Sequence, residues 1–149
     1  MRIILNGNPI PQQRPRFAKY SKHIYDPQAD LKKKLFPQLL PQIPKELFDD
    51  FIFLQMIFYM PFQKSVSKKF IEENFHLPHI KRPDIDNLIK FYLDLMIGFV
   101  YTDDCTVAKI SAQKVYSNNP RTLIIINPMG GEMITEHILE YETLSIEDI

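Results

Sequence analysis

Four carboxylates and a lysine are concentrated in one stretch of the chain, residues 81–104. The segment KRPDIDNLIK (residues 81–90) places Asp84 and Asp86 two residues apart where a helix is expected to begin, and Lys90 one turn into that helix. A second acidic pair, Asp103 and Asp104, follows the expected end of the helix. A divalent cation prefers carboxylate oxygens, and a phosphate needs positive charge beside it. A metal site acting on a phosphate therefore explains both signs of charge.

The spacing is suitable for a shared metal ion. In an extended approach to the helix, side chains at i and i+2 point the same way, so Asp84 and Asp86 can reach one cation. Lys90 is four residues after Asp86 and is expected on the same helix face. Magnesium keeps several of its waters, so two or three carboxylates suffice to hold it. We expect the third to come from Asp103 or Asp104.

Each of these residues also has a common structural role. Asp86 alone is typical of a helix N-cap, and Lys90 alone is typical of a solvated helix surface. The Asp103–Asp104 pair alone is typical of a turn before a strand. Asp94 is expected to be structural, with Lys90 as an i, i+4 partner. Taken jointly, the four acids and the lysine favour a functional site.

Basic side chains form a second constellation near the N-terminus. They interleave with Phe17 and Tyr20 in and after a proline-stiffened segment, residues 9–16, which cannot be helical. Arginine suits phosphate contacts, and aromatic rings stack on exposed bases. We predict DNA contacts from six residues, four in this arm and two just before the acids: Arg14, Arg16, Lys19, Lys22, Lys81 and Arg82.

The net charge of zero conceals an asymmetry along the chain. Residues 1–40 carry eight Lys or Arg against two Asp or Glu, whereas residues 121–149 carry one against six. This division indicates a body that binds a polyanion and an acidic C-terminal appendage.

The pattern of elements predicts one α/β domain. Its mixed sheet should have about four to five strands, flanked by two to four helices. Residues 51–59 are apolar nearly throughout and predict a central strand buried on both faces. Asp26 should cap the first helix, Asp86 or Asn87 should cap the central one, and Gly98 should end it. The remaining elements are expected as strands at 2–5, 105–116 and 122–127, a strand or hairpin at 17–25, and helices at 68–74 and 132–141.

Length and composition limit the other possibilities. A chain of 149 residues is one domain with a sizeable core. The single cysteine, Cys105, excludes an internal disulfide and is expected to be a small buried residue. There is no apolar run of membrane length, and the N-terminus does not read as a signal peptide, so we expect a cytoplasmic protein.

Segment 81–116 resembles the signature of the RusA-like endonucleases, which are Holliday junction resolvases. The opening strand with Gly7, followed by the prolines and arginines of residues 9–16, also resembles the start of that family. The likeness covers roughly residues 1–126. It implies a RusA-like endonuclease domain at residues 1–128, and leaves an acidic C-terminal helical extension at 129–149 outside the family pattern.

The resemblance implies a homodimer that cuts four-way DNA junctions with Mg²⁺, or with Mn²⁺ as a substitute, and without a small-molecule cofactor. It implies metal-binding carboxylates at Asp84, Asp86 and Asp104, with Asp103 less favoured, and an essential lysine at Lys90. Such resolvases act in DNA recombination and repair, in the cytoplasm of a bacterial or phage-infected cell.

Three other functions remain open at this point. Asp-x-Asp also occurs in glycosyltransferases that bind a sugar nucleotide through a metal ion, although 149 residues is short for one. Phosphatases of the haloacid dehalogenase type need their Asp-x-Asp at the end of an apolar strand, and residues 79–83 are not apolar. A non-catalytic DNA-binding module explains the basic arm but not the acids.

Overall fold

A four-stranded mixed sheet organises the chain in this computed structural model, which describes residues 1–14, 16–17 and 24–128. It confirms the α/β class, with one mixed sheet and three α-helices in the described part. The sheet strands are β1 (Arg2–Asn6), β4 (Ile52–Pro61), β5 (Val107–Ser117) and β6 (Arg121–Pro128). The helices are α1 (Ala29–Leu39), α2 (Lys68–Asn74) and α3 (Ile85–Met96), with short 3₁₀ turns η1 (Leu40–Gln42) and η2 (Asp104–Thr106).

The strands are ordered β1-β6-β4-β5. β6 is antiparallel to both β1 and β4, whereas β4 and β5 are parallel. β5 and β6 follow one another in the chain but do not pair, because β4 lies between them. The turn at residues 118–120 therefore crosses the end of β4 instead of closing a hairpin.

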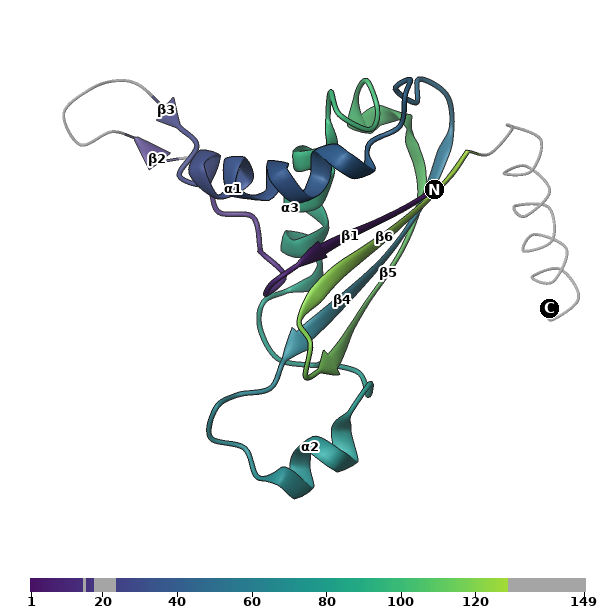
Figure 1. The fold of residues 1–149 in the computed structure, drawn as a ribbon. Coiled ribbons are helices and arrows are strands. Elements are labelled where there is room, and N and C mark those ends of the chain that lie inside the picture. Colours follow the sequence, from purple (N-terminus) through teal and green to yellow (C-terminus); the bar gives the residue numbers. More distant parts are fainter. Residues whose placement is uncertain (15, 18–23, 129–149) are drawn as a thin grey trace, which may run out of the picture.

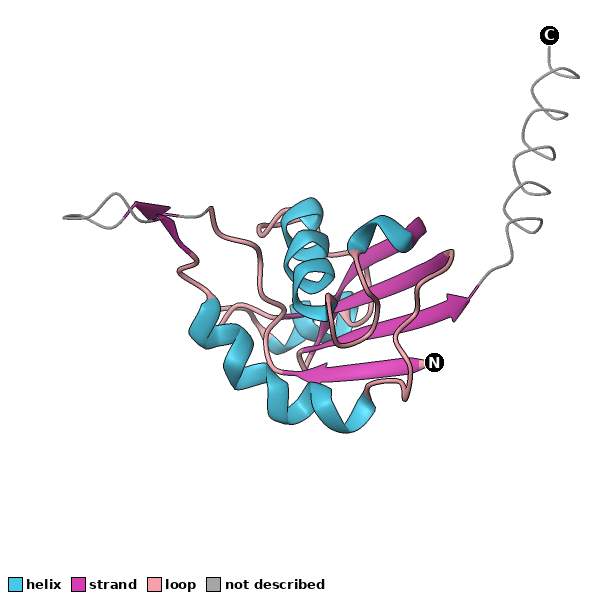
Figure 2. Ribbon diagram, turned by 90° about the horizontal axis from the view of Figure 1, so that it is seen from above, coloured by secondary structure: helices cyan, strands magenta, loops and turns pink. Residues whose placement is uncertain are grey.

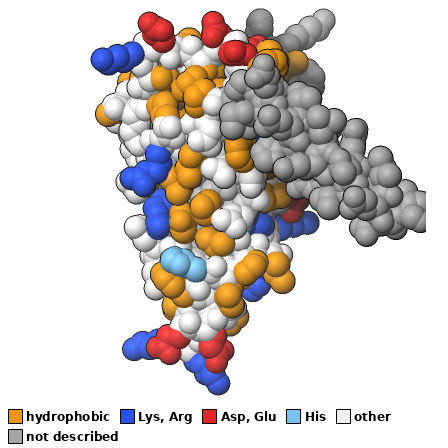
Figure 3. Space-filling model, turned by 90° about the vertical axis from the view of Figure 1, so that its right-hand side faces the viewer, with side chains coloured by type: hydrophobic (Ala, Val, Ile, Leu, Met, Phe, Trp, Pro, Cys, Tyr) orange, Lys and Arg blue, Asp and Glu red, His pale blue; other side chains and the backbone are white. Residues whose placement is uncertain are grey.

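β4 is a central strand, as expected, but it is fully buried on one face alone. Alternate side chains from Ile52 to Met60 are buried, and those between them are half-buried. The expectation of burial on both faces was wrong, because α1 and α3 lie on the same side of the sheet (Figure 1). The opposite side, the open face, gathers hydrophobic side chains at the surface (Figure 3). Its half-buried members include Ile4, Ile57, Leu123 and Ile125.

α3 provides most of the helical side of the core. Its buried residues are Leu88, Phe91, Tyr92, Leu95 and Met96, which share one amphipathic stripe. The polar residues of α3, including Asp86 and Lys90, are thereby left on the surface. The site residues on this helix are thus positioned by the burial of its opposite stripe.

α1, which lies beside β1 (Figure 2), and the η1 turn that follows it together cover the edge of the sheet at β1. The Gln42 side chain accepts from the Ile4 N–H at 2.9 Å and donates to the Ile4 carbonyl at 2.8 Å. Gln38, one turn earlier, accepts from the Asn6 N–H at 2.7 Å. These amides satisfy edge groups that would otherwise pair with another strand.

Helix boundaries differ from expectation in two places. α1 begins at Ala29, since Asp26 does not cap it but accepts from the Gln28 N–H at 2.8 Å in a turn before the helix. α3 begins with Asp84 as its N-cap residue, two positions before the expected Asp86. By contrast, α2 has the predicted bounds, and Ser67 caps it by accepting a hydrogen bond from the Phe70 N–H at 3.1 Å.

Part of the N-terminal arm forms a second, two-stranded sheet. β2 (Arg16–Phe17) and β3 (Ile24–Tyr25) pair antiparallel, as the hairpin prediction requires. The polar tip between them lies outside the described residues, as does the predicted helix at 132–141. No helix in the described ranges is long and apolar enough to cross a membrane.

The chain turns sharply after α3, and the residues that follow the turn are hydrogen-bonded to the helix. Gly98 has a φ of 77°, a left-handed conformation that glycine adopts without strain, and it follows the end of the helix as predicted. Tyr101 is fully buried, and its hydroxyl donates to the Leu93 carbonyl of α3 at 2.6 Å. This bond fixes where residues 103–104 leave the core.

Replacing Tyr101 with phenylalanine should therefore destabilise the protein. Tyr101→Phe removes the donor to the half-buried Leu93 carbonyl, and we expect a loss of about 1–3 kcal/mol in the free energy of unfolding. Urea denaturation would measure the loss, with Tyr59→Phe on the open face as the matched control. Equal stabilities for the two variants would contradict this role of the Tyr101 hydroxyl.

Candidate active site at the start of helix α3

The carboxylate of Asp84 is free at the N-terminus of α3. Asp84 has the extended backbone of an N-cap residue, and its carbonyl accepts from the Leu88 N–H at 3.3 Å. Its side chain makes no capping hydrogen bond and is exposed. Capping, the common structural role for an acid here, is therefore not what this carboxylate does.

Asp86 and Lys90 form an exposed pair on the same helix face. Their charged groups are 3.9 Å apart, and the two side chains are 66% and 65% exposed. Such a pair contributes little stability, so both groups are available to a ligand. However, Asp86 lies inside the helix, so the expected extended run through both acids is wrong.

The two acids of the second pair, Asp103 and Asp104, have different surroundings. Asp103 caps η2 and accepts from the Cys105 N–H at 2.9 Å, a bond that lowers the pKa of Asp103. The hydrogen bond with the Asp103 carboxyl is the largest cause that raises the pKa of Asp104, and slight desolvation adds to it. The Asp103 carboxylate is thus bound to the backbone of Cys105. Asp104 instead lines a hollow of about 240 Å³, the acidic hollow, with Lys90, Leu93, Asp94 and Gln12.

The proline-rich segment crosses α3 beside this hollow. The Gln12 N–H donates to the Asn87 carbonyl at 2.8 Å, and the Ile10 N–H donates to the Tyr92 hydroxyl at 3.1 Å. The buried Gln28 holds the other side, accepting from the Gln13 N–H and donating to the Pro11 carbonyl. Four hydrogen bonds therefore hold residues 10–13 of this segment between α3 and Gln28.

Asp94 is a structural acid, as expected, but its partner is Lys32 rather than Lys90. The Lys32 ammonium is 2.6 Å from Asp94 and 2.8 Å from Asp26. This pairing joins α1 to α3 and leaves Lys90 to Asp86. Because Lys32 is held in these ion pairs, it is not available for a DNA contact, whereas Lys33 and Lys34 of α1 are exposed.

Lys114 of β5 is a residue of this site that sequence analysis missed. Its ammonium donates to the carbonyls of Lys81 and Pro83, both at 2.6 Å, and so clamps the backbone directly before Asp84. Burial lowers the pKa of Lys114, and the nearby Asp84 carboxylate opposes that shift. No sequence signal marks this lysine, because its partners are backbone oxygens about thirty positions away.

The structure brings some of the predicted site residues close together. Lys90 and Asp104 share one hollow, and Asp84 and Asp86 lie at the start of the same helix. Among the described residues, no three Asp, Glu, His or Cys side chains are close enough together to hold one metal ion. The donors present nevertheless fit a hard cation: they are carboxylates, and the buried Gln12 amide oxygen has no hydrogen-bond partner in the described part of the chain.

Three of the six predicted DNA contacts lie in the described residues with their side chains, and they are close to this site in sequence. Arg14 is exposed two residues after Gln12, and Lys81 and Arg82 are exposed immediately before the acids. Arg16 lies in β2, but its side chain is outside the described part, as are Lys19 and Lys22. Cys105 is exposed, and the expectation that it is buried was wrong because it belongs to η2 and not to a strand.

Comparison with known proteins assigns the family. The model of the family described as endodeoxyribonuclease RusA matches residues 6–127, a span that contains all five residues that line the acidic hollow and also the start of α3. The chain belongs to the RusA endodeoxyribonuclease family. Membership implies an endodeoxyribonuclease, and it sets aside the glycosyltransferase and phosphatase alternatives.

One relative is similar to this chain over nearly the full length of both proteins. The uncharacterized protein YqaN of Bacillus subtilis (strain 168) is 29% identical over 142 residues, covering 88% of this chain and 98% of that protein. The likeness therefore covers nearly all of a protein of similar size. Its name states no activity.

Proposed function

We propose that this RusA family member is a magnesium-dependent, structure-selective endodeoxyribonuclease that resolves Holliday junctions by paired symmetric nicks, in DNA recombination and repair. The observation that carries the proposal is that Lys90 and Asp104, fourteen residues apart in sequence, line one hollow beside the middle of α3, the helix that begins at Asp84 and Asp86. A cation and a carboxylate around one hollow suit a site that binds a metal ion and a phosphate together.

In this proposal Asp84, Asp86 and Asp104 hold the divalent cation. The Asp84 carboxylate is not used for capping, and that of Asp86 is bound only in an exposed pair. Asp104 is preferred to Asp103, since Asp103 is already bound to the Cys105 N–H. When bound, the cation supplies Lewis-acid charge at the scissile phosphate.

Lys90 acts on the phosphate itself. Its ammonium is on the exposed face of α3 and is loosely held by Asp86 at 3.9 Å. Negative charge grows on the phosphoryl oxygens in the transition state of in-line displacement. A lysine already positioned beside those oxygens stabilises the transition state more than the ground state.

Lys114 is a positioning residue for Asp84, and its removal should slow cleavage. Lys114→Met keeps the packing of the alkyl stem but removes both bonds to the backbone of residues 81–83. We expect about a 10- to 100-fold lower cleavage rate and a higher magnesium concentration at half-maximal rate, as for other supports of metal ligands. Lys109→Met on the same strand is the control. An unchanged magnesium midpoint would leave Lys114 with a purely structural role.

Symmetric nicking requires two copies of the site. A four-way junction has near two-fold symmetry, so we propose a C2 homodimer. The stripe of α3 is buried within the protomer, and we therefore assign the contact to the open face of the sheet around Ile57 and Leu123. Light scattering should give twice the mass of the chain, and a monomer at micromolar concentration would contradict the arrangement.

The basic arm should contribute phosphate contacts. Its hydrogen bonds to α3 hold residues 10–13 beside the acidic site, and Arg14 follows directly. Replacing Arg14, Arg16 and Lys19 together with glutamine should weaken junction binding. The slope of log affinity against log salt should fall by about one unit for each true phosphate contact. Fluorescence anisotropy at several salt concentrations measures the slope, and an unaltered slope would exclude the arm from the interface.

A synthetic four-way junction tests the function directly. With magnesium we expect two symmetric nicks near the branch point, and none with a chelator present. A linear duplex of the same sequence is the substrate control, and a sugar nucleotide should stay intact. A protein that binds the junction but never cuts it with Mg²⁺ or Mn²⁺ would instead be a non-catalytic DNA-binding module, the second candidate, which the basic arm favours.

A further inference from the structure

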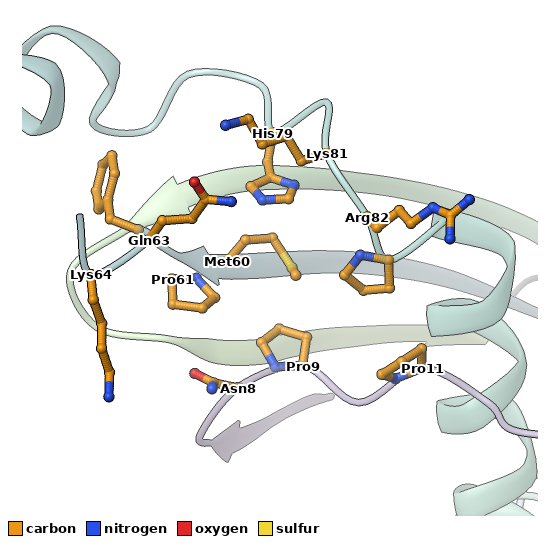
Figure 4. Close-up of a pocket in the computed structure, with 12 residues that line it drawn as sticks. Asn8, Pro9, Pro11, Met60, Pro61, Gln63, Lys64, His79, Lys81 and Arg82 are labelled. Atoms are coloured by element: carbon orange, nitrogen blue, oxygen red, sulfur yellow. The ribbon is translucent and has the colours of Figure 1, made fainter. Parts of the chain in front are cut away.

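A second hollow, of about 480 Å³, shares no lining residue with the acidic hollow. It is bounded by the arm at Pro9 and Pro11, by the end of β4 and the residues after it, and by residues 79–83. Figure 4 shows its side chains, with Met60, Pro9 and Pro61 towards the middle and Lys64 and Arg82 at opposite ends. This hollow has no role in the proposed metal site.

The chemistry of its walls is unusual for an exposed hollow. The floor is made of rings and a thioether, among them Pro9 and Met60, which are buried. The rim carries three exposed cations, Lys64, Lys81 and Arg82, and no carboxylate is among the lining residues. A flat apolar ligand attached to a phosphate would match both the floor and the rim.

The floor is also rigid and poor in hydrogen-bond donors. Proline has a fixed φ and no N–H, so Pro9, Pro61 and Pro83 offer ring surfaces rather than polar groups. The His79 ring is buried against Tyr116, with ring centroids 4.7 Å apart. Burial, together with the charge of Lys114, lowers the pKa of His79, so this side chain adds no positive charge to the floor.

The hollow adjoins the acidic site through two pairs of neighbouring residues. Pro83 lines the hollow and precedes Asp84, while Pro11 lines it and precedes Gln12 of the acidic hollow. A DNA strand whose phosphate lies at the acids would therefore carry an adjacent base to the edge of this hollow. The volume of about 480 Å³ lies in the range of sites that enclose small organic ligands.

We propose that this hollow binds one nucleobase of the DNA, unstacked from the strand next to the scissile phosphate. Lys64, Lys81 and Arg82 hold the flanking phosphates, and the proline floor receives the face of the base. This inference rests on the proposed junction-cutting function, and it adds a subsite that fixes where the strand lies relative to the acids.

The test uses junctions with 2-aminopurine placed at one position at a time near the branch point. Protein is added to saturation in a chelator, so that the DNA stays intact. At one position we expect the fluorescence to rise roughly twofold or more on binding, because the base leaves its stack. Lys64→Glu should abolish most of the rise at saturation. Lys68→Glu, an equally exposed charge reversal outside the hollow, should retain it.

The outcomes separate the subsite from the function on which it rests. If the wild-type protein binds and cuts junctions but the 2-aminopurine fluorescence rises at no position, the base subsite is overturned and the nuclease function stands. Equal signals in Lys64→Glu and Lys68→Glu would likewise overturn the subsite, since the base would then be unstacked elsewhere. Failure of the wild-type protein to bind junctions would overturn both proposals.

Discussion

Asp84→Asn and Asp86→Asn are each expected to abolish junction cleavage while junction binding survives or strengthens. Each substitution keeps the size of the side chain and removes one charged oxygen ligand, so the rate should fall by at least ~10²- to 10³-fold. Removing a negative charge also lessens repulsion of the DNA, which favours binding. Single-turnover cleavage and anisotropy binding would be measured on the same junction.

Asp30→Asn is the matched control for these acids. Asp30 is exposed in the first turn of α1, a local setting similar to that of Asp86 in α3, but it is on a different helix from the acidic motif. It should cut at the wild-type rate. Near wild-type rates for Asp84→Asn and Asp86→Asn with magnesium would mean that the metal site is misplaced. Asp104→Asn compared with Asp103→Asn would then decide the third ligand, and we expect the larger loss at Asp104.

Lys90→Ala is expected to lower the cleavage rate by at least ~10²-fold, the scale of losing one group that stabilises transition-state charge. The stability of the fold should hardly change, because the side chain is 65% exposed and its pair with Asp86 is weak. Lys90→Arg should rescue poorly, since a planar guanidinium does not replace a compact ammonium. Single-turnover rates at saturating enzyme would separate this effect from weaker binding.

Lys33→Ala provides the comparison for Lys90. Lys33 is likewise exposed on a helix, but it lies on α1 and does not line the hollow. We expect it to affect cleavage little at saturating enzyme. If Lys90→Ala behaved in the same way, Lys90 would be reduced to an ordinary surface residue.

Several of the differences from expectation have one physical cause: the local sequence does not show which other elements pack against a segment. The run of apolar residues in β4 predicted burial on both faces, yet helices cover only one. The apolar pattern shows that a segment prefers to leave water, but not how many layers the fold supplies. In the same way, Asp94 had a plausible partner one turn away in Lys90, and the packing of α1 brought Lys32 closer.

The sequence by itself determined the element types, the amphipathic stripe of α3, the Gly98 turn and the residues of the acidic motif, because these depend on neighbours within a few positions. Only the tertiary structure decided that Asp104 shares a hollow with Lys90 and that Lys114 clamps the chain before Asp84. It also brought the proline-rich arm into the walls of both the acidic hollow and a second, cation-rimmed one. These arrangements depend on contacts between segments far apart in the chain, made through backbone oxygens and shared surfaces that leave no periodic signal in the sequence.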